Sequence, residues 1–155
     1  MIKTILSDLS YVLIFPKNNS YHDELNALYQ KVGSKDDFVF GEYFVINQSL
    51  FDYYKSLKSN FEIAMYTSGT LQNAKDIKDK VSETFSKVYS ASELGISKKD
   101  PNSYILIADK LKKETSEILF IDDTLANVEA AQRAGVNAVR FQSNEVLFKE
   151  MKSYL

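Results

Sequence analysis

The chain has 155 residues, 45% of them hydrophobic and 26% charged, which is the composition expected of one globular domain. Its net charge of −2 gives no electrostatic reason to expect nucleic acid or an anionic membrane as a partner. It contains no cysteine and one histidine, which excludes disulfides, thiolate catalysis, cysteine-ligated metals and multi-histidine metal sites. Any metal must therefore be held by oxygen atoms, which points to magnesium.

No apolar run in the sequence is long enough to span a bilayer. The opening residues, MIKTILSDLS, turn acidic too early for a secretory signal peptide. We therefore expect a cytoplasmic protein, with neither a membrane nor nucleic acid among its partners.

In chain order, short apolar runs that predict strands alternate with amphipathic stretches that predict helices. The strands are expected at 2–6, 61–66, 87–89, 118–121 and 137–141. The helices are expected at 21–32, 49–57, 71–81, 102–113, 124–134 and 144–155. Because the strands are continuously apolar, we predict an α/β fold with a parallel sheet covered by helices on both faces, a doubly wound Rossmann-like sandwich.

The stretch between the first two predicted strands is less regular. An apolar segment at 11–15 ends at Pro16 and suggests a hairpin or flap. Residues 34–47 mix charges with four aromatic side chains, which we interpret as core or as the underside of a small helical insert. A base-stacking surface is disfavoured because no basic patch accompanies them. His22, without a partner of its kind, is interpreted as a surface or helix-start residue.

An adjacent pair of carboxylates, Asp122 and Asp123, follows the apolar run 118–121. Two carboxylates at the end of a buried strand repel each other, and the usual remedies are a bound cation, a raised pKa or a basic partner. A single aspartate there is usually only a helix cap, and Asp123 or Thr124 could serve as one. The pair favours a metal site, but capping stays open as an alternative.

Hydroxyl residues follow the second predicted strand, at 67–70 (Thr-Ser-Gly-Thr). A strand, a turn of small hydroxyl residues and a helix start together form an anion cradle, because backbone N–H groups and a hydroxyl point at one place. The alternative is a plain N-cap by Ser68 or Thr70. Lys98 and Lys99 precede a further helix start at Asp100 and add positive charge for a phosphate, unless they are two solvated surface lysines.

These polar clusters come from distant parts of the chain but share one topological position. In doubly wound sheets, ligands bind beyond the carboxyl ends of the strands. The clusters that stand at such ends are Asp8, Thr67 with Ser68, and Asp122 with Asp123. Together with a helix-start lysine they predict one site for magnesium and a phosphate group.

Four segments resemble the motifs of the haloacid dehalogenase-like (HAD) superfamily, and within it the small sugar-phosphate phosphatases and the phosphatase domain of soluble epoxide hydrolases. In chain order they are LSDLSYVL (6–13), MYTSGT (65–70), LGISKKDPNSY (94–104) and FIDDTLANVEAAQRAGVNAVRF (120–141). The resemblance covers nearly the whole chain, and the last segment is the most specific. It implies the strand order 3-2-1-4-5 and a single HAD-like domain, in which a reduced helical cap insert occupies about 17–47.

The resemblance also implies a role for each matching residue around the metal. Asp8 matches the nucleophile that attacks phosphorus and becomes an aspartyl-phosphate. Asp123 matches the carboxylate that holds Mg²⁺, with Asp122 beside it as a second acidic partner. The main-chain carbonyl of Ser10 matches the remaining protein ligand.

A second group of residues matches the phosphate-binding part of the family pattern. Thr67 and Lys98 match the hydroxyl and the ammonium that neutralise the transferring phosphoryl group. Leu9, next to the nucleophile, is included among the phosphate contacts. Ser68 stands where the family often has asparagine, and Lys99 stands where proline is common.

The main departure from the family pattern is Ser10, because related phosphatases have an aspartate there that protonates the leaving group and activates water. Its replacement implies slow dephosphorylation, a leaving group that needs no acid, or a non-catalytic relative. The Gly-Thr pair that often follows is replaced by Tyr11 and Val12. A haloacid dehalogenase is disfavoured, since those enzymes need no magnesium and do not keep an adjacent acidic pair.

Two functions follow from the resemblance. The first is a magnesium-dependent phosphatase-like hydrolase that acts on a small phosphorylated molecule. The second is a catalytically degenerate relative that binds a ligand or a protein. Because the insert is short, the site is expected to be open, so that it accepts bulky substrates or takes a lid from another subunit of a homo-oligomer.

Overall fold

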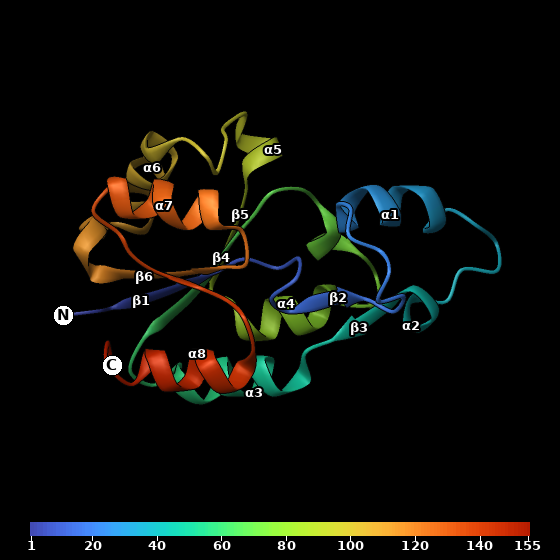
Figure 1. Ribbon diagram of the computed structural model, residues 1–155, viewed down its shortest axis with the longest axis horizontal. Helices are drawn as coiled ribbons and strands as arrows, with labels where there is room; N and C mark the ends of the chain where they lie inside the picture. The colour runs from blue at the N-terminus through green and yellow to red at the C-terminus, as the bar shows by residue number, and fades with distance from the viewer.

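A five-stranded parallel sheet forms the centre of the protein, whose computed structural model describes residues 1–155 (Figure 1). Its order is β5-β4-β1-β6-β7, the predicted order 3-2-1-4-5 with the strands of the insert left out. The strands are β1 (Thr4–Ser7), β4 (Glu62–Thr67), β5 (Lys87–Ser90), β6 (Ile118–Asp122) and β7 (Asn137–Arg140). The predicted α/β doubly wound fold is therefore confirmed.

The register of the central strands brings their carboxyl ends to one edge of the sheet. Ser7, the last residue of β1, lies opposite Met65 of β4 and Ile121 of β6. Each of the three strands then ends within two residues of that level. Side chains that follow β1, β4 and β6 consequently emerge close together, although the chain separates them widely.

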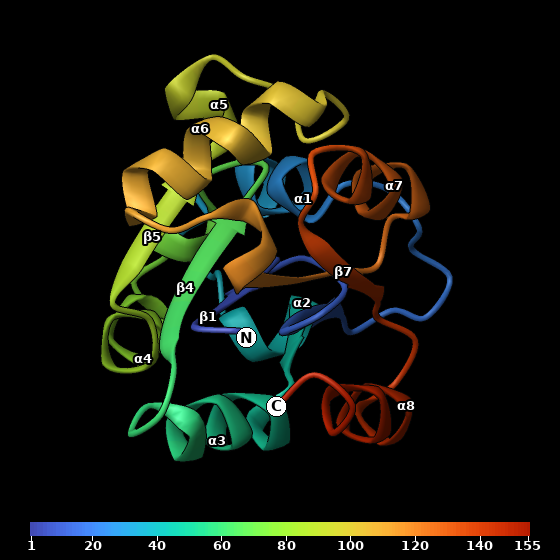
Figure 2. The same cartoon turned by 90° about the vertical axis from the view of Figure 1, so that its left-hand side faces the viewer.

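Two helical layers cover the sheet, and each layer has its own apolar cluster (Figure 2). One face packs on α3 (Gln48–Leu57), α4 (Lys78–Thr84) and α8 (Asn144–Met151). The other packs on α6 (Pro101–Leu111) and α7 (Leu125–Arg133), with the short α5 (Ala91–Leu94) beside them. Successive strand residues enter opposite clusters, Ile5 the first and Leu6 the second, because side chains alternate along a strand.

Most predicted helices appear with shifted ends, and one is interrupted. The helix expected at 71–81 is a short 3₁₀ turn, η1 (Leu71–Asn73), followed by α4. Ala74 leaves the helical region with ψ of 134°, which separates the two pieces. The helix start expected at Asp100 is confirmed, because the Asp100 carboxylate accepts a hydrogen bond from the Asn102 N–H at 2.9 Å and proline occupies the first turn.

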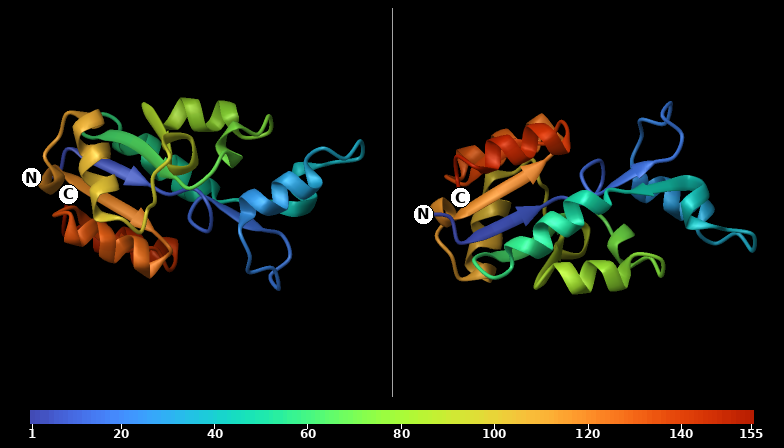
Figure 3. Two further views of the ribbon diagram at one scale, coloured as in Figure 1. Left: turned by 90° about the horizontal axis from the view of Figure 1, so that it is seen from above. Right: turned by 90° about the horizontal axis from the view of Figure 1, so that it is seen from below.

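The segment between β1 and α3 projects beyond the carboxyl edge of the sheet (Figure 3). Two short strands, β2 (Ile14–Pro16) and β3 (Phe44–Ile46), form an antiparallel ribbon. Beyond it lie α1 (Leu25–Val32) and the single-turn α2 (Phe40–Tyr43). The apolar run at 11–15 supplies one strand of an antiparallel pair, as expected of a hairpin or flap, but its partner β3 follows the whole insert instead of the next turn.

Aromatic side chains hold the insert together. Phe38 stacks on Tyr43 with ring centroids 5.8 Å apart, and Phe40 stacks on Phe44 at 4.7 Å. Tyr29 of α1 meets Phe38 edge-on at 5.9 Å. Phe40 and Phe44 are buried in the core, as interpreted, whereas Phe38 and Tyr43 are partly buried against it; the division of the chain into a domain and a cap stays a prediction. No helix in the structure is long and apolar enough to cross a membrane.

Candidate active site

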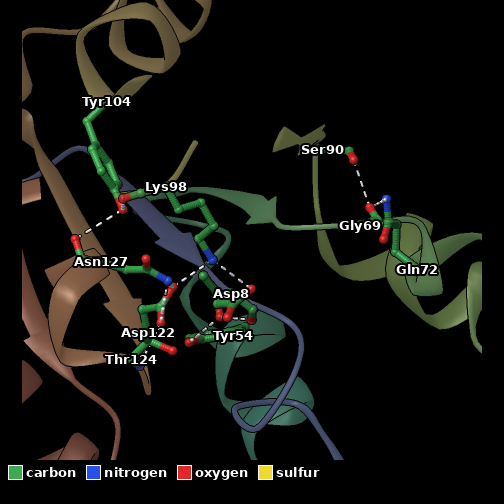
Figure 4. Close-up of polar contacts among 11 residues, drawn as sticks. Asp8, Tyr54, Gly69, Gln72, Ser90, Lys98, Tyr104, Asp122, Thr124 and Asn127 are labelled. Carbon is green, nitrogen blue, oxygen red and sulfur yellow. Dashed lines mark hydrogen bonds and ion pairs between the residues drawn. The ribbon is translucent and has the colours of Figure 1, made fainter. Parts of the chain in front are cut away.

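Asp8, Lys98 and Asp122 form a buried cluster of charges at the carboxyl edge of the sheet (Figure 4). The Lys98 Nζ lies 2.9 Å from Asp8 Oδ1 and 2.6 Å from Asp122 Oδ2. The lysine side chain is only 3% exposed, which rules out the solvated alternative for Lys98, whereas Lys99 is exposed. Residues from three distant segments of the chain therefore meet in one ion-paired group.

The backbone of Asp8, which directly follows β1, is held by hydrogen bonds on both its N–H and its carbonyl group. Its N–H donates to the Ile121 carbonyl at 2.9 Å, which continues the β1–β6 pairing by one residue. The Ser7 hydroxyl donates to the Asp8 carbonyl at 2.8 Å and accepts from the buried Tyr54 hydroxyl at 3.0 Å. The Asp8 carboxylate is therefore carried by a firmly held stretch of backbone.

The Asp122 carboxylate accepts hydrogen bonds from the turn after β6 and from α7. Thr124 N–H donates to Asp122 Oδ1 at 2.8 Å, and Asn127 Nδ2 lies 3.2 and 3.1 Å from the two carboxylate oxygens. The Thr124 side chain makes no cap hydrogen bond, so the alternative in which Thr124 caps the helix is wrong. Asn127 was missed by sequence reasoning; its place in the first turn of the helix after the acidic pair is the signal that could have revealed it.

Lys98 is held in place by contacts to its main-chain carbonyl and to its ammonium group. The Tyr104 hydroxyl lies 2.7 Å from the Lys98 carbonyl and 3.1 Å from that of Asn127. The Lys98 Nζ lies 5.4 Å from the ring centroids of both Tyr66 and Phe120, within the range of cation–π attraction. The aromatic rings thus fill the space around the ammonium and leave it facing the carboxylates.

Two carboxyl groups of the site, those of Asp8 and Asp123, carry raised pKa values. Burial raises the pKa of Asp8 to about 7, opposed by Lys98 and increased further by Asp122. Burial, together with the neighbouring Asp122, raises the pKa of Asp123 to about 6. Burial lowers the pKa of Lys98, but the two carboxylates outweigh it, so its pKa is raised and it stays charged. One ammonium therefore does not fully offset three carboxylates.

The three carboxylates are close enough to share a cation. Asp8, Asp122 and Asp123 each offer an oxygen atom, and these atoms lie within 4.8 Å of one another. A set of carboxylate oxygens with surplus negative charge suits a hard divalent cation such as Mg²⁺. The donor set therefore fits the metal that the sequence predicts.

Residues 67–70, which comprise the last residue of β4 and the turn after it, are the segment that the sequence predicts to bind phosphate, and we call them the phosphate-binding loop. Thr67 is fully buried, and its hydroxyl has no hydrogen-bond partner in the protein. The Gly69 carbonyl accepts from Ser90 Oγ at 2.8 Å and from Gln72 Nε2 at 2.9 Å (Figure 4). The alternative of a plain N-cap by Thr70 is wrong, because its side chain makes no cap hydrogen bond.

A polar pocket of about 240 Å³ opens above these groups. It is lined by the predicted residues Asp8, Ser10, Ser68 and Asp123, whereas Thr67 and Lys98 are buried and do not line it. The Ser10 hydroxyl is buried without a partner, and Leu9 is fully buried, so only the Leu9 backbone can face a ligand. The insert closes one side with five consecutive residues, His22, Asp23, Glu24, Leu25 and Asn26.

Solved structures with a similar fold include several from the HAD family. A HAD family enzyme of Bacteroides thetaiotaomicron, in complex with magnesium and inorganic phosphate, matches with a TM-score of 0.69 and 19% identity over 93% of this chain and 96% of that one. A predicted HAD-like family hydrolase of Porphyromonas gingivalis matches with a TM-score of 0.64 and 16% identity over 99% and 98%. A 2-haloacid dehalogenase of Pseudomonas syringae gives 0.66 and 15% over 91% and 86%. At such identities the likeness establishes the fold alone.

A family model for haloacid dehalogenase-like hydrolases matches residues 17–135, well over half of the chain. The resemblance inferred from the four motifs is thus confirmed at the level of the family, while the sugar-phosphate phosphatase branch stays a prediction. The fold, the position of the acidic cluster and the family model agree: this chain belongs to the haloacid dehalogenase-like hydrolases.

Proposed function

We propose that this protein is a magnesium-dependent phosphatase-like hydrolase that acts on a small phosphomonoester through an aspartyl-phosphate on Asp8. The observation that carries the proposal is the buried group of Asp8, Lys98 and Asp122 beside Asp123. The Bacteroides enzyme was crystallised in complex with magnesium and inorganic phosphate, which supports the same ligands here. Only two of the twelve residues that line the pocket are hydrophobic, which favours a small polar substrate.

The metal site is proposed on the oxygen atoms that face the pocket. Asp8 and Asp123 line it, whereas the oxygens of Asp122 already meet Lys98, Thr124 and Asn127. We therefore assign direct metal contact to Asp8 and Asp123, with the Ser10 carbonyl as the third protein ligand, and assign Asp122 first to holding Lys98. Mg²⁺, when bound, supplies positive charge against the phosphoryl oxygens.

The chain's own residues carry the proposed reaction in two steps. The Asp8 oxygen that does not face Lys98 forms a bond to phosphorus, and the bond between phosphorus and the leaving oxygen breaks. Lys98 and the unpartnered Thr67 hydroxyl donate to the phosphoryl oxygens as negative charge shifts onto them. Water then attacks phosphorus, which releases inorganic phosphate and restores the Asp8 carboxylate.

Ser10 limits the proton transfers of both steps, because a serine hydroxyl is a weak acid and a weaker base at neutral pH. We expect Ser10→Asp to raise phosphate release from a phosphomonoester by about 10- to 100-fold, below the 10²–10⁴-fold that general acid–base catalysis typically supplies. The measurement is steady-state phosphate release at saturating Mg²⁺. Ser10→Asn, which matches the size of the aspartate but has no acidic group, should leave the rate unchanged; an equal gain in both variants would contradict the role.

The raised pKa values predict a pH dependence of metal binding. In the folded metal-free protein Asp8 keeps its proton up to a pKa of about 7, against an ordinary value of 3.8. The folded state then binds more protons than the unfolded state between these values, so the free energy of unfolding falls as pH rises through this range. Mg²⁺ competes with that proton, so its stabilising effect should grow as pH rises.

Urea unfolding with and without Mg²⁺, between about pH 5 and pH 8, tests this expectation. The free energy that Mg²⁺ adds should increase with pH, by up to about 1.4 kcal/mol per pH unit for the proton on Asp8. Asp8→Asn should flatten the dependence. A contribution from Mg²⁺ that is the same at all pH values would show that the ion does not bind at these carboxylates.

A second function, binding without turnover, is favoured by one observation, the serine at position 10. If no activity appears with Mg²⁺ and an aryl phosphate, and Ser10→Asp restores none, the binding function is supported. The physiological substrate, a homo-oligomeric state and a cytoplasmic location stay predictions. A screen of phosphorylated metabolites is the direct route to the substrate.

A further inference from the structure

One side chain of the insert, Asn26, reaches across to the phosphate-binding loop (residues 67–70). Asn26 is the second residue of α1, and its Oδ1 accepts hydrogen bonds from the N–H groups of Thr70 at 3.0 Å and Leu71 at 2.9 Å. These N–H groups stand at the start of η1, where no carbonyl of the helix itself can serve them. Asn26 therefore caps η1 from a distant part of the chain.

Gly69 lets the insert come this close. A Cβ atom at position 69 would lie 2.5 Å from both Cγ and Oδ1 of Asn26 and 2.8 Å from its Nδ2, and these are its three nearest atoms. Gly69 is not among the glycines with positive φ, so its backbone is one that alanine can adopt. Glycine at this position is thus required by contact with Asn26 rather than by the shape of the turn.

The same loop is also anchored by residues outside the insert, at the end of β5, in α5 and in η1. The Gly69 carbonyl accepts from Ser90 and Gln72, and the Ser68 carbonyl accepts from the Ser92 N–H at 3.0 Å. Ser68 also lines the same pocket as Asp8 and Asn26. If the contact with Asn26 is lost, the loop keeps its hydrogen bonds to Ser90, Ser92 and Gln72 but loses the one to the insert.

We propose that Asn26 is a positioning residue that holds the phosphate-binding loop in its binding shape and ties that shape to the docking of the insert. This inference rests on the proposed function of the site and adds a residue that touches neither the metal nor the nucleophile. With Asn26 in place, the hydroxyl and N–H groups of the loop are already oriented for a phosphate group before it binds. Orientation before binding raises affinity, because less ordering is required when the ligand arrives.

Isothermal titration of inorganic phosphate in the presence of Mg²⁺ tests the proposal through a double-mutant cycle. Asn26→Ala should raise the Kd of phosphate about tenfold, in keeping with two lost hydrogen bonds to neutral groups. Gly69→Ala alone should raise it as well, since the added methyl group collides with Asn26. In the double variant the methyl group enters the space that Asn26 leaves, so its Kd should equal that of Asn26→Ala. Additive effects would overturn the proposal.

Amide hydrogen exchange supplies a second readout on the same proteins. The N–H groups of Thr70 and Leu71 should exchange faster in Asn26→Ala, and Asn26→Asp, which keeps an acceptor oxygen, should restore their protection. The matched control is Asn18→Ala, because Asn18 Oδ1 accepts from Ser20 N–H at 2.9 Å elsewhere in the insert. This control should change neither the exchange of the loop nor the Kd.

The outcomes separate the inference from the function on which it rests. A wild-type protein that binds no phosphate overturns both. A wild-type protein that hydrolyses a phosphomonoester, with an unchanged Kd of phosphate in Asn26→Ala, overturns the role of Asn26 alone.

Discussion

Asp8→Asn is expected to abolish turnover of any phosphomonoester that the wild-type protein hydrolyses. The substitution keeps the size of the side chain but removes the oxygen that attacks phosphorus, and loss of a nucleophile typically costs at least about 10³-fold in kcat. Phosphate release under saturating substrate and Mg²⁺ is the measurement. The protein should remain folded, since burial already disfavours the charged form of Asp8 and an amide carries no charge to desolvate.

Asp109→Asn is the matched control for this variant, because Asp109 is an exposed aspartate on α6. It makes the same chemical change far from the pocket and should leave kcat and the unfolding midpoint unchanged. Activity of the Asp8→Asn protein within tenfold of the wild type would remove Asp8 from the chemistry and with it the proposed covalent intermediate.

Lys98→Met should impair both catalysis and folding. The substitution keeps the apolar stem among the aromatic rings but leaves two carboxylates buried without their cation. Their side chains are 7% exposed at Asp8 and fully buried at Asp122, and breaking such a buried pair costs about 3–5 kcal/mol. Removing the ammonium that faces the phosphoryl group should also lower kcat by about 10²–10³-fold.

The response of Lys98→Met to Mg²⁺ should show that its lost stability comes from the missing positive charge. Mg²⁺ replaces part of the missing positive charge, so it should restore more stability to this variant than to the wild type in urea unfolding. Lys99→Met, which removes the neighbouring exposed lysine, should behave like the wild type in both assays. Equal effects at positions 98 and 99 would mean that the lysine acts only through net charge.

Much of the fold follows from local patterns in the sequence. The runs around Ile5, Ile63 and Phe120 are largely apolar, which is the pattern of strands buried on both faces, and the structure places their apolar side chains alternately in two cores. The break in the helix expected at 71–81 could not be foreseen. It lies at Ala74, where the backbone leaves the helical region. The short η1 before it is capped by Asn26, through a contact that spans more than forty positions of the chain.

The same limit applies to the site. Strand ends share an edge, so the meeting of Asp8 with Asp122 could be expected from topology. Asn127 and Tyr104 have no motif of their own that marks them, because their value lies in hydrogen bonds to groups the fold brings near, the Asp122 carboxylate and the Lys98 carbonyl. The place of Asn127 in the first turn after the acidic pair is a hint in the sequence, but the hydrogen bonds themselves become visible only when the strands are joined in space to the helices that cover them.

The phosphoenzyme is the species that tests the central claim most directly. Because Ser10 is a weak base for its hydrolysis, the aspartyl-phosphate should accumulate when the protein meets a reactive phosphate ester with Mg²⁺. Acid quenching followed by peptide mass spectrometry should then find one phosphoryl group on the peptide that contains Asp8, and none without Mg²⁺ or in Asp8→Asn. Phosphate release by a protein whose Asp8 peptide never carries that group, or equal labelling of the Asp8→Asn protein, would contradict the account.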